Sequence, residues 1–342
     1  MKVARIHAHG GPEALVYEDA PEPRIQADQI LLRVRACALN HLDLFVRQGM
    51  PGVEIPMPHV LGSDIAGEVA AVGDLCERIK PGQRVLLSPG LSCRQCEQCV
   101  SGRDNFCRQY RLFGYQVDGG NAEWIAAPEY AAIPIPDALS FEEAAAVPLV
   151  FLTAWHMLMG RARLEPGEDV LVIGATSGVG SAAVQIAKLL HCRVIGTAGS
   201  EEKLARAREI GADHLIDHHR QDIAAEVRKL TAKRGVDVVF EHAGTATWEK
   251  SVASLTAGGR LVTCGATTGY DARLDLRYLF SKQYSVLGSF MGSMGELHRV
   301  LKFVFRGELR AVIDRVYPLA EIREAHERLE SGGQVGKVVV TA

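Results

Sequence analysis

Four of the chain's eight cysteines lie close together, and their spacing is typical of a metal site. The stretch CRQCEQCVSGRDNFC has the pattern Cys-x2-Cys-x2-Cys-x7-Cys. Four thiolates complete the tetrahedral shell of a Zn2+ ion and leave no coordination position for water or substrate. We therefore predict one structural zinc per chain, in a lobe at about residues 90–110 whose folding depends on the metal. The predicted ligands are Cys93, Cys96, Cys99 and Cys107.

A second stretch, VLVIGATSGVGSAAVQIAK, could bind the pyrophosphate of a dinucleotide. Its glycines lie between a buried strand and a helix, where small residues let the backbone approach a phosphate and free N–H groups meet its charge. The loop reads ATSGVG rather than a strict GxGxxG, so the prediction depends on the strand before it and the helix after it. The expected contacts are Gly174, Ala175, Thr176, Ser177, Gly178, Val179 and Gly180.

The end of the following strand indicates which nucleotide binds. An Asp or Glu usually holds the free 2'-hydroxyl of NAD there, but residues 198–200 read Ala-Gly-Ser. Hydroxyl and cationic donors nearby could bind a 2'-phosphate, so we predict NADP(H) in preference to NAD(H). The two glutamates that follow Ser200 oppose this prediction. The expected contacts on this side are Ser200, Lys203, His218 and Arg220.

The elements that position these residues form two groups. The first half contains short strands such as QILLRVRACALN and DIAGEVAAVG, and then a helical stretch that begins with a capping box at Ser140 and Glu143. From DVLVIGA to YSVLGSF strands and helices alternate, which predicts a parallel sheet covered on both faces. We expect one domain at residues 1–150 and 293–342 and a dinucleotide-binding domain at 151–292.

Composition excludes several classes of partner. The chain has 342 residues, of which 47% are hydrophobic and 23% charged, and a formal net charge of -3. These values give no reason to expect nucleic acid or a membrane as partner. We expect a cytoplasmic protein, because no signal peptide and no apolar run of about 18 residues is present. The four scattered cysteines are expected to be buried thiols.

The cysteine cluster, the loop GATSGVGSAAVQIAK and the ending GKVVV together resemble the medium-chain dehydrogenase/reductase superfamily over nearly the whole chain. This family includes zinc alcohol dehydrogenases and quinone reductases. The resemblance implies an α/β fold with a GroES-like, mostly-β catalytic domain and a doubly wound Rossmann domain. It implies a structural zinc in the cysteine lobe, in agreement with the geometric prediction. It also implies cofactor contacts for His41, Thr153 and Lys337.

The catalytic zinc of the family's alcohol dehydrogenases has no matching ligands here. Its cysteine position holds Asn40, its His-Glu pair reads Ser63-Asp64, and its third ligand falls near Leu149. An amide, a hydroxyl and an alkyl side chain do not make a zinc site. The motifs N-x-x-D and GSDIAG instead resemble the quinone oxidoreductase branch. Phe45, in place of a frequent Tyr, and the four-cysteine lobe both depart from that branch.

A metal-free active site restricts the substrate. Zinc stabilises the charge that hydride transfer creates on oxygen, whereas a quinone or an α,β-unsaturated carbonyl delocalises that charge itself. We therefore predict NADPH-dependent reduction of such small molecules. Asn40 could donate a hydrogen bond to the oxygen, and Asp43 is expected to be a structural anchor. The candidate catalytic residues are Asn40, Asp64 and Thr153.

Two alternatives stay open. The first is a zinc-type alcohol dehydrogenase that interconverts alcohols and carbonyl compounds, with a second zinc rebuilt from His41, His59 and Asp64. The second is a nucleotide-binding protein without turnover. Whichever of these functions is correct, we expect a homodimer or homotetramer, because the last strand, YSVLGSF, would leave an unpaired sheet edge.

Overall fold

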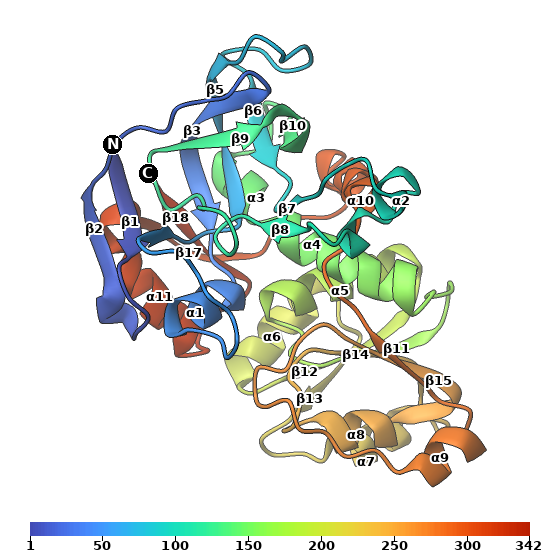
Figure 1. Ribbon diagram of the computed structural model, residues 1–342. Coiled ribbons are helices and arrows are strands. Elements are labelled where there is room, and N and C mark those ends of the chain that lie inside the picture. The colour runs from blue at the N-terminus through green and yellow to red at the C-terminus, as the bar shows by residue number, and fades with distance from the viewer. The chain divides into compact units, whose positions relative to one another are not determined.

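The computed structural model describes residues 1–342, which form two compact units (Figure 1). Unit 1 comprises residues 1–149 and 293–342, and unit 2 comprises residues 150–292. The predicted boundary differs from this division by one residue. No helix combines the length and the apolar character needed to cross a membrane.

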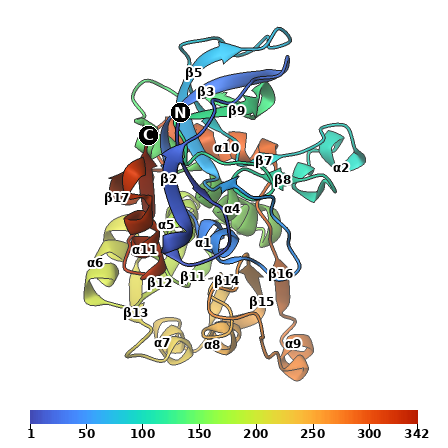
Figure 2. The same ribbon diagram turned by 60° about the vertical axis from the view of Figure 1, so that its left-hand side comes forward.

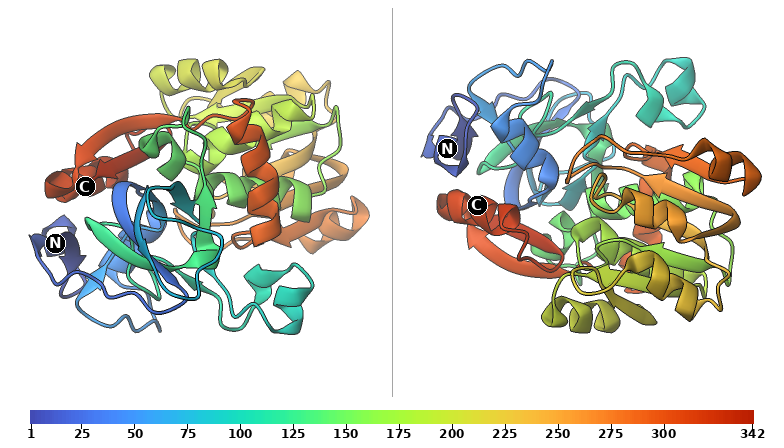
Figure 3. Two further views of the ribbon diagram at one scale, coloured as in Figure 1. Left: turned by 90° about the horizontal axis from the view of Figure 1, so that it is seen from above. Right: turned by 90° about the horizontal axis from the view of Figure 1, so that it is seen from below.

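Unit 1 is built around the long strand β3. Its side chains alternate between the core and the surface over most of its length, and β3 pairs antiparallel with β5, β9 and β18. The tail of the chain therefore returns beside the N-terminal strands, as the red and blue segments of Figure 3 show. The strands of the main sheet are β3 (Gln29–Ala38), β5 (Asp64–Val72), β6 (Arg84–Leu87), β9 (Trp124–Pro128), β10 (Ala132–Pro134), β17 (Ile313–Pro318) and β18 (Lys337–Thr341).

Shorter elements complete unit 1. Unit 1 also contains a three-stranded sheet and a two-stranded ribbon. Their strands are β1 (Lys2–Ile6), β2 (Leu15–Asp19), β4 (His59–Val60), β7 (Gly90–Leu91) and β8 (Arg111–Leu112). The helices are η1 (Pro12–Ala14), α1 (His41–Gln48), α2 (Glu97–Val100), η2 (Asp104–Phe106), η3 (Glu129–Ala131), α3 (Phe141–Ala145), α10 (Met294–Phe305), η5 (Leu319–Glu321) and α11 (Ile322–Glu330).

Unit 2 is a six-stranded parallel sheet in the order β13-β12-β11-β14-β15-β16. Helices α5 and α6 cover one face and α7 and α8 the other, as Figure 2 shows. This is the predicted doubly wound arrangement, so the α/β fold class is confirmed. The strands are β11 (Asp169–Val172), β12 (Arg193–Ala198), β13 (His214–Asp217), β14 (Val236–Glu241), β15 (Leu255–Thr263) and β16 (Ser285–Gly288). The helices are α5 (Gly178–Leu189), α6 (Glu201–Ile210), α7 (Ile223–Leu230), α8 (Trp248–Ala253) and α9 (Leu276–Ser281).

The structure differs from the sequence-based predictions at two places. The predicted capping box is present at the start of α3, but the helical stretch breaks before Pro148 and continues as α4 (Pro148–Trp155) and a π-helical turn, η4 (His156–Arg161). Proline has no N–H to donate to the preceding turn, which explains the break. Strand β13 was not predicted, because its four residues are too short for a period to be recognised.

Candidate active site and structural metal site

The four clustered cysteines converge in one lobe of unit 1. Their sulfur atoms all lie within 4.8 Å of one another, and the Sγ atoms of Cys96 and Cys99 are 3.5 Å apart. A tetrahedral zinc with bonds of about 2.3 Å places its sulfur ligands about 3.8 Å apart, so the arrangement fits this ion. Cys96 caps α2 and Cys107 follows η2, so two short helical turns present the ligands.

The electrostatics of the lobe also suit a cation. Backbone N–H groups of Gln95 and Cys96 lower the pKa of the Cys93 thiol to about 6, which favours the thiolate that binds metal. Burial raises the pKa of Cys99 to about 11, and a dication would keep this sulfur deprotonated as well. The chain contains no other group of three or more His, Cys, Asp or Glu side chains that could hold a metal. The predicted structural zinc cluster is therefore present.

Three residues that were predicted separately meet at the end of β3, and we call Asn40, Asp64 and Lys337 the buried triad. Lys337 Nζ lies 2.5 Å from Asn40 Oδ1 and 2.9 Å from Asp64 Oδ2, and Asn40 Nδ2 donates to Asp64 Oδ2 at 2.9 Å. The exposed fractions are 7%, 0% and 4% respectively, so the ion pair is shielded from water. Asp64 begins β5 and Lys337 begins β18, the two strands that flank the end of β3.

Asp43 anchors the segment that carries the triad. Its carboxylate accepts the N–H of Asn40 at 2.6 Å and the N–H of Gly62 at 2.8 Å. Burial raises the pKa of Asp43 to about 6, while these two hydrogen bonds oppose the shift. Both oxygens are therefore occupied by backbone donors, as the anchor role requires, and Asp43 is not free to act as a proton donor.

The donor set around Asp64 does not fit a catalytic zinc. The Ser63 hydroxyl donates to the carbonyl of Phe113 at 2.7 Å, and the Leu149 N–H occupies the second oxygen of Asp64 at 2.8 Å. His59 Nδ1 lies 3.2 Å from Asp118 Oδ1, and His59 Nε2 is buried without a hydrogen-bond partner.

The side chains of the alternative zinc site do not come together either. His41 is the exposed first residue of α1, whereas His59 lies buried in β4. Because His41, His59 and Asp64 form no group that could hold a metal, the rebuilt zinc site is not supported.

The phosphate loop, residues 173–180, contains all seven residues that the glycine pattern singled out. Gly174 has a φ of 60°, and a Cβ at Gly180 would lie 2.2 Å from the carbonyl oxygen of Gly174, so both positions require glycine. Ser177 Oγ accepts the N–H of Gly180 at 2.9 Å and caps α5. The N–H groups of Gly178 and Val179 lack intrahelical partners and could meet an anion.

The residues expected near a 2'-phosphate follow β12 and β13. Ser200 Oγ accepts the N–H of Lys203 at 3.2 Å and caps α6, and Arg220 pairs with Glu201 at 3.0 Å. His218 Nδ1 is buried without a hydrogen-bond partner, and burial lowers the pKa of His218. The structure thus brings the four residues to the same end of the sheet, but Ser200 and Arg220 already have partners within the chain.

Two further contacts to the phosphate loop were not predicted from the sequence. Thr197 Oγ1 accepts the N–H of Gly174 at 3.0 Å, and His242 Nε2 lies 3.2 Å from Ser177 Oγ. Both residues approach from other strands, so no local pattern could reveal them. Thr153 lies in α4, and its buried hydroxyl has no partner; its contact with a nicotinamide stays a prediction.

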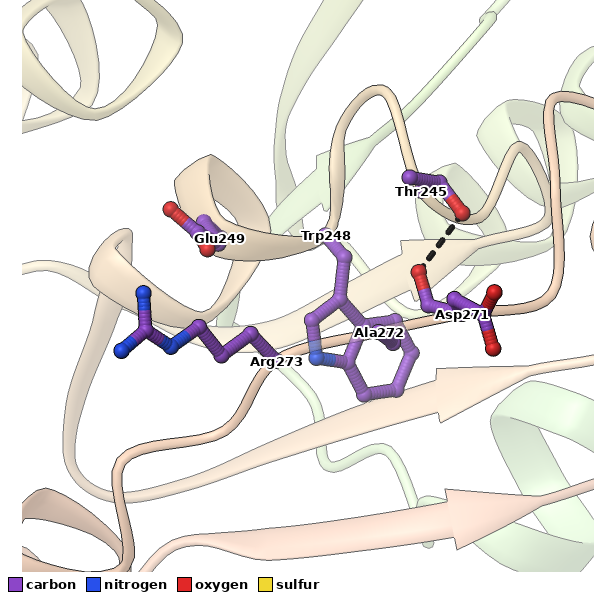
Figure 4. Close-up of a pocket in the computed structure, with 6 residues that line it drawn as sticks. All are labelled: Thr245, Trp248, Glu249, Asp271, Ala272 and Arg273. Carbon is purple, nitrogen blue, oxygen red and sulfur yellow. Dashed lines mark hydrogen bonds between the residues drawn. The ribbon is translucent and has the colours of Figure 1, made fainter.

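Unit 2 also has a hollow on its surface. It is lined by the indole of Trp248 and by the segment 271–273, and the Thr245 hydroxyl donates to the carbonyl of Asp271 at 2.7 Å (Figure 4). It includes none of the predicted site residues.

Comparison with known proteins matches both units to described families. Residues 26–137 match "Alcohol dehydrogenase GroES-like domain", and residues 178–306 match "Zinc-binding dehydrogenase". The GroES-like prediction for unit 1 is therefore confirmed.

The full chain is similar to proteins with two kinds of name. It is 33% identical to the NAD-dependent alcohol dehydrogenase of Sulfolobus acidocaldarius, over 99% of both chains. It is 29% identical to human quinone oxidoreductase, over 99% of this chain and 97% of the relative. A crystal structure of an NAD-dependent alcohol dehydrogenase shares 44% identity and a TM-score of 0.97 over the whole of both chains. These similarities favour the alcohol dehydrogenase alternative over the reduction of quinones or conjugated carbonyls.

Proposed function

Because the chain belongs to the medium-chain dehydrogenase/reductase superfamily and is an NAD(P)-dependent oxidoreductase, we propose a specific reaction for it. This reaction is hydride transfer from NADPH to a quinone or an α,β-unsaturated carbonyl compound, without a catalytic metal. We also propose a cytoplasmic location, where reducing conditions keep the four zinc-binding thiols reduced.

The observation that carries this proposal is the ammonium group of Lys337 beside Asp64 and Asn40. A catalytic zinc needs several anionic or imidazole ligands around an open coordination position. Here the Asp64 carboxylate is already paired with the buried ammonium of Lys337. The amide of Asn40 takes the place of the cysteine that binds zinc in the family's alcohol dehydrogenases. A substrate that delocalises the incoming charge can react with hydrogen bonds and a fixed ammonium alone.

The phosphate loop and the buried triad would have separate roles in this reaction. The N–H groups of Gly178 and Val179 would hold the cofactor pyrophosphate, and the bound nicotinamide supplies the hydride. The amide hydrogens of Asn40 are already donated within unit 1, so its predicted bond to substrate would need one of them released. The third hydrogen of the Lys337 ammonium has no acceptor in the chain, so we propose that Lys337 stabilises the charge on the substrate oxygen.

A second candidate is interconversion of alcohols and carbonyl compounds, as in zinc-type alcohol dehydrogenases. The relative at 33% identity and the solved structure at 44% identity favour it, since both are named as NAD-dependent alcohol dehydrogenases. This candidate requires a second metal site that the side chains around Asp64 do not supply.

A panel of acceptors and a metal assay separate the candidates. We expect NADPH oxidation with quinones and enones to continue after treatment with a chelator, and we expect one zinc per chain by atomic emission. Two zinc ions per chain, with turnover of simple alcohols that chelators abolish, would establish the second candidate. Tight cofactor binding without NADPH oxidation by any acceptor would establish a nucleotide-binding protein without turnover.

The preference for NADPH is a separate prediction. We expect Arg220→Ala to raise the KM for NADPH about tenfold and to leave the KM for NADH unchanged, because a charge-assisted bond to a 2'-phosphate is lost. Arg206→Ala, on the exposed side of α6, is the control and should change neither value. The NAD-dependent relatives argue against this preference, and a higher kcat/KM with NADH than with NADPH in the unaltered chain would refute it.

We also propose that unit 2 forms a dimer through its sheet edge. Strand β16 is one of the two edge strands, Val286 on it is 36% exposed, and Phe280 in the preceding helix is 72% exposed. An unpaired apolar edge favours self-association. Light scattering should give the molar mass of at least a dimer for the unaltered chain. The double variant Phe280→Lys/Val286→Lys should have the mass of a monomer. Leu75→Lys, at an exposed leucine of unit 1, should leave the mass unchanged.

A further inference from the structure

The imidazole of His242 links the end of β14 to the phosphate loop, although no motif singles it out. Its Nε2 atom lies 2.9 Å from the carbonyl oxygen of Ile173 and 3.2 Å from Ser177 Oγ. We propose that His242 is a positioning residue that fixes the Ser177 hydroxyl as a hydrogen-bond donor to a cofactor phosphate. This inference rests on the proposed binding of a nicotinamide dinucleotide by unit 2.

The carbonyl of Ile173 selects the tautomer of His242. A carbonyl oxygen only accepts hydrogen bonds, so Nε2 at 2.9 Å must carry the proton. The single Nε2–H group is then shared between the Ile173 carbonyl and Ser177 Oγ in a three-centre hydrogen bond, so Ser177 Oγ can accept from the ring but cannot donate to it. The same oxygen also accepts the N–H of Gly180 at 2.9 Å.

The two acceptor positions of the Ser177 hydroxyl are thereby occupied. Its own proton has no acceptor within the chain, so it remains available to an anion above the loop. The N–H groups of Gly178 and Val179 lie in the same first turn of α5 and also lack intrahelical partners. The hydroxyl and the two amides would then act together on one phosphate.

The ring is held close to the loop. A Cβ at Gly174 would lie 3.2 Å from His242 Nε2, so the glycine admits the imidazole at contact distance. Burial lowers the pKa of His242, which keeps the ring neutral and preserves its single donor at neutral pH. An edge contact with Phe240, at 6.2 Å between ring centres, limits its rotation further.

The test compares His242→Leu with His242→Gln, which keeps an N–H donor on a side chain of similar reach. Dissociation constants for NADPH and NADH are measured by nucleotide fluorescence, and kcat at saturating cofactor. We expect His242→Leu to weaken binding about tenfold while kcat stays within about twofold, and His242→Gln to recover most of the affinity. The control, His214→Leu, lies at the opposite end of the parallel strands and should bind the cofactor as the unaltered chain does.

A double-mutant cycle identifies the route of the effect. If His242 acts through Ser177, adding His242→Leu to Ser177→Ala should weaken binding by no more than about twofold. Additive losses, or unchanged affinity in His242→Leu with an unchanged melting temperature, would overturn the inference. If the unaltered chain binds neither NADPH nor NADH, it is the proposed function that fails.

Discussion

Replacing Lys337 by methionine is expected to destabilise unit 1 by about 3–5 kcal/mol, because the carboxylate of Asp64 is then left buried without a counter-charge. Asp64 is 0% exposed and cannot recover hydration without a rearrangement of β3, β5 and β18. Differential scanning fluorimetry should show the melting temperature fall by roughly 10 °C. Because the ammonium is the proposed stabiliser of charge on the substrate, kcat should fall by about a hundredfold or more.

A second variant separates the charge effect from simple loss of a side chain. In Lys337→Met/Asp64→Asn both charges are removed, so most of the stability should return while activity remains low. Lys80→Met, at an exposed lysine, should change stability by less than about 0.5 kcal/mol. A single Lys337→Met variant as stable as the unaltered chain would show that the buried pair contributes nothing.

The second large effect is expected at the metal lobe. Cys96→Ser should reduce the zinc content from one ion per chain to nearly none, since a structural zinc site in isolated peptides supplies about 10–16 kcal/mol of binding energy to folding. The carboxylate of Asp104, within the lobe, accepts the N–H of Met294 at 3.0 Å and holds the start of α10. Loss of metal should therefore expose both segments, and limited proteolysis should cut near residues 93–107 and near the start of α10.

Removal of a thiol outside the cluster provides the control. Cys76→Ser should keep one zinc and the protease resistance of the lobe, because the Cys76 thiol hydrogen-bonds only to the carbonyls of Ala27 and Gln29, outside the cluster. Retention of zinc by Cys96→Ser, with an unchanged digestion pattern, would contradict the four-sulfur site.

The zinc lobe and the phosphate loop were predictable because their residues are neighbours in the sequence. Four cysteines within one short lobe, or a glycine turn between one strand and one helix, need only local backbone geometry to come together. The alternation of strands and helices likewise indicated the parallel sheet of unit 2, since each crossover is short and packs on the sheet it leaves.

Contacts between distant segments were decided only by tertiary structure. Lys337 and Asn40 are 297 positions apart, and the register of β18 against β3 brings them within 2.5 Å. His242 reaches Ser177 across 65 positions because β14 lies beside β11 in the sheet. A sequence pattern records residue types at fixed short spacings, whereas strand pairing sets which distant side chains share a buried space. The identity of the cation beside Asp64 therefore became visible only in the folded chain.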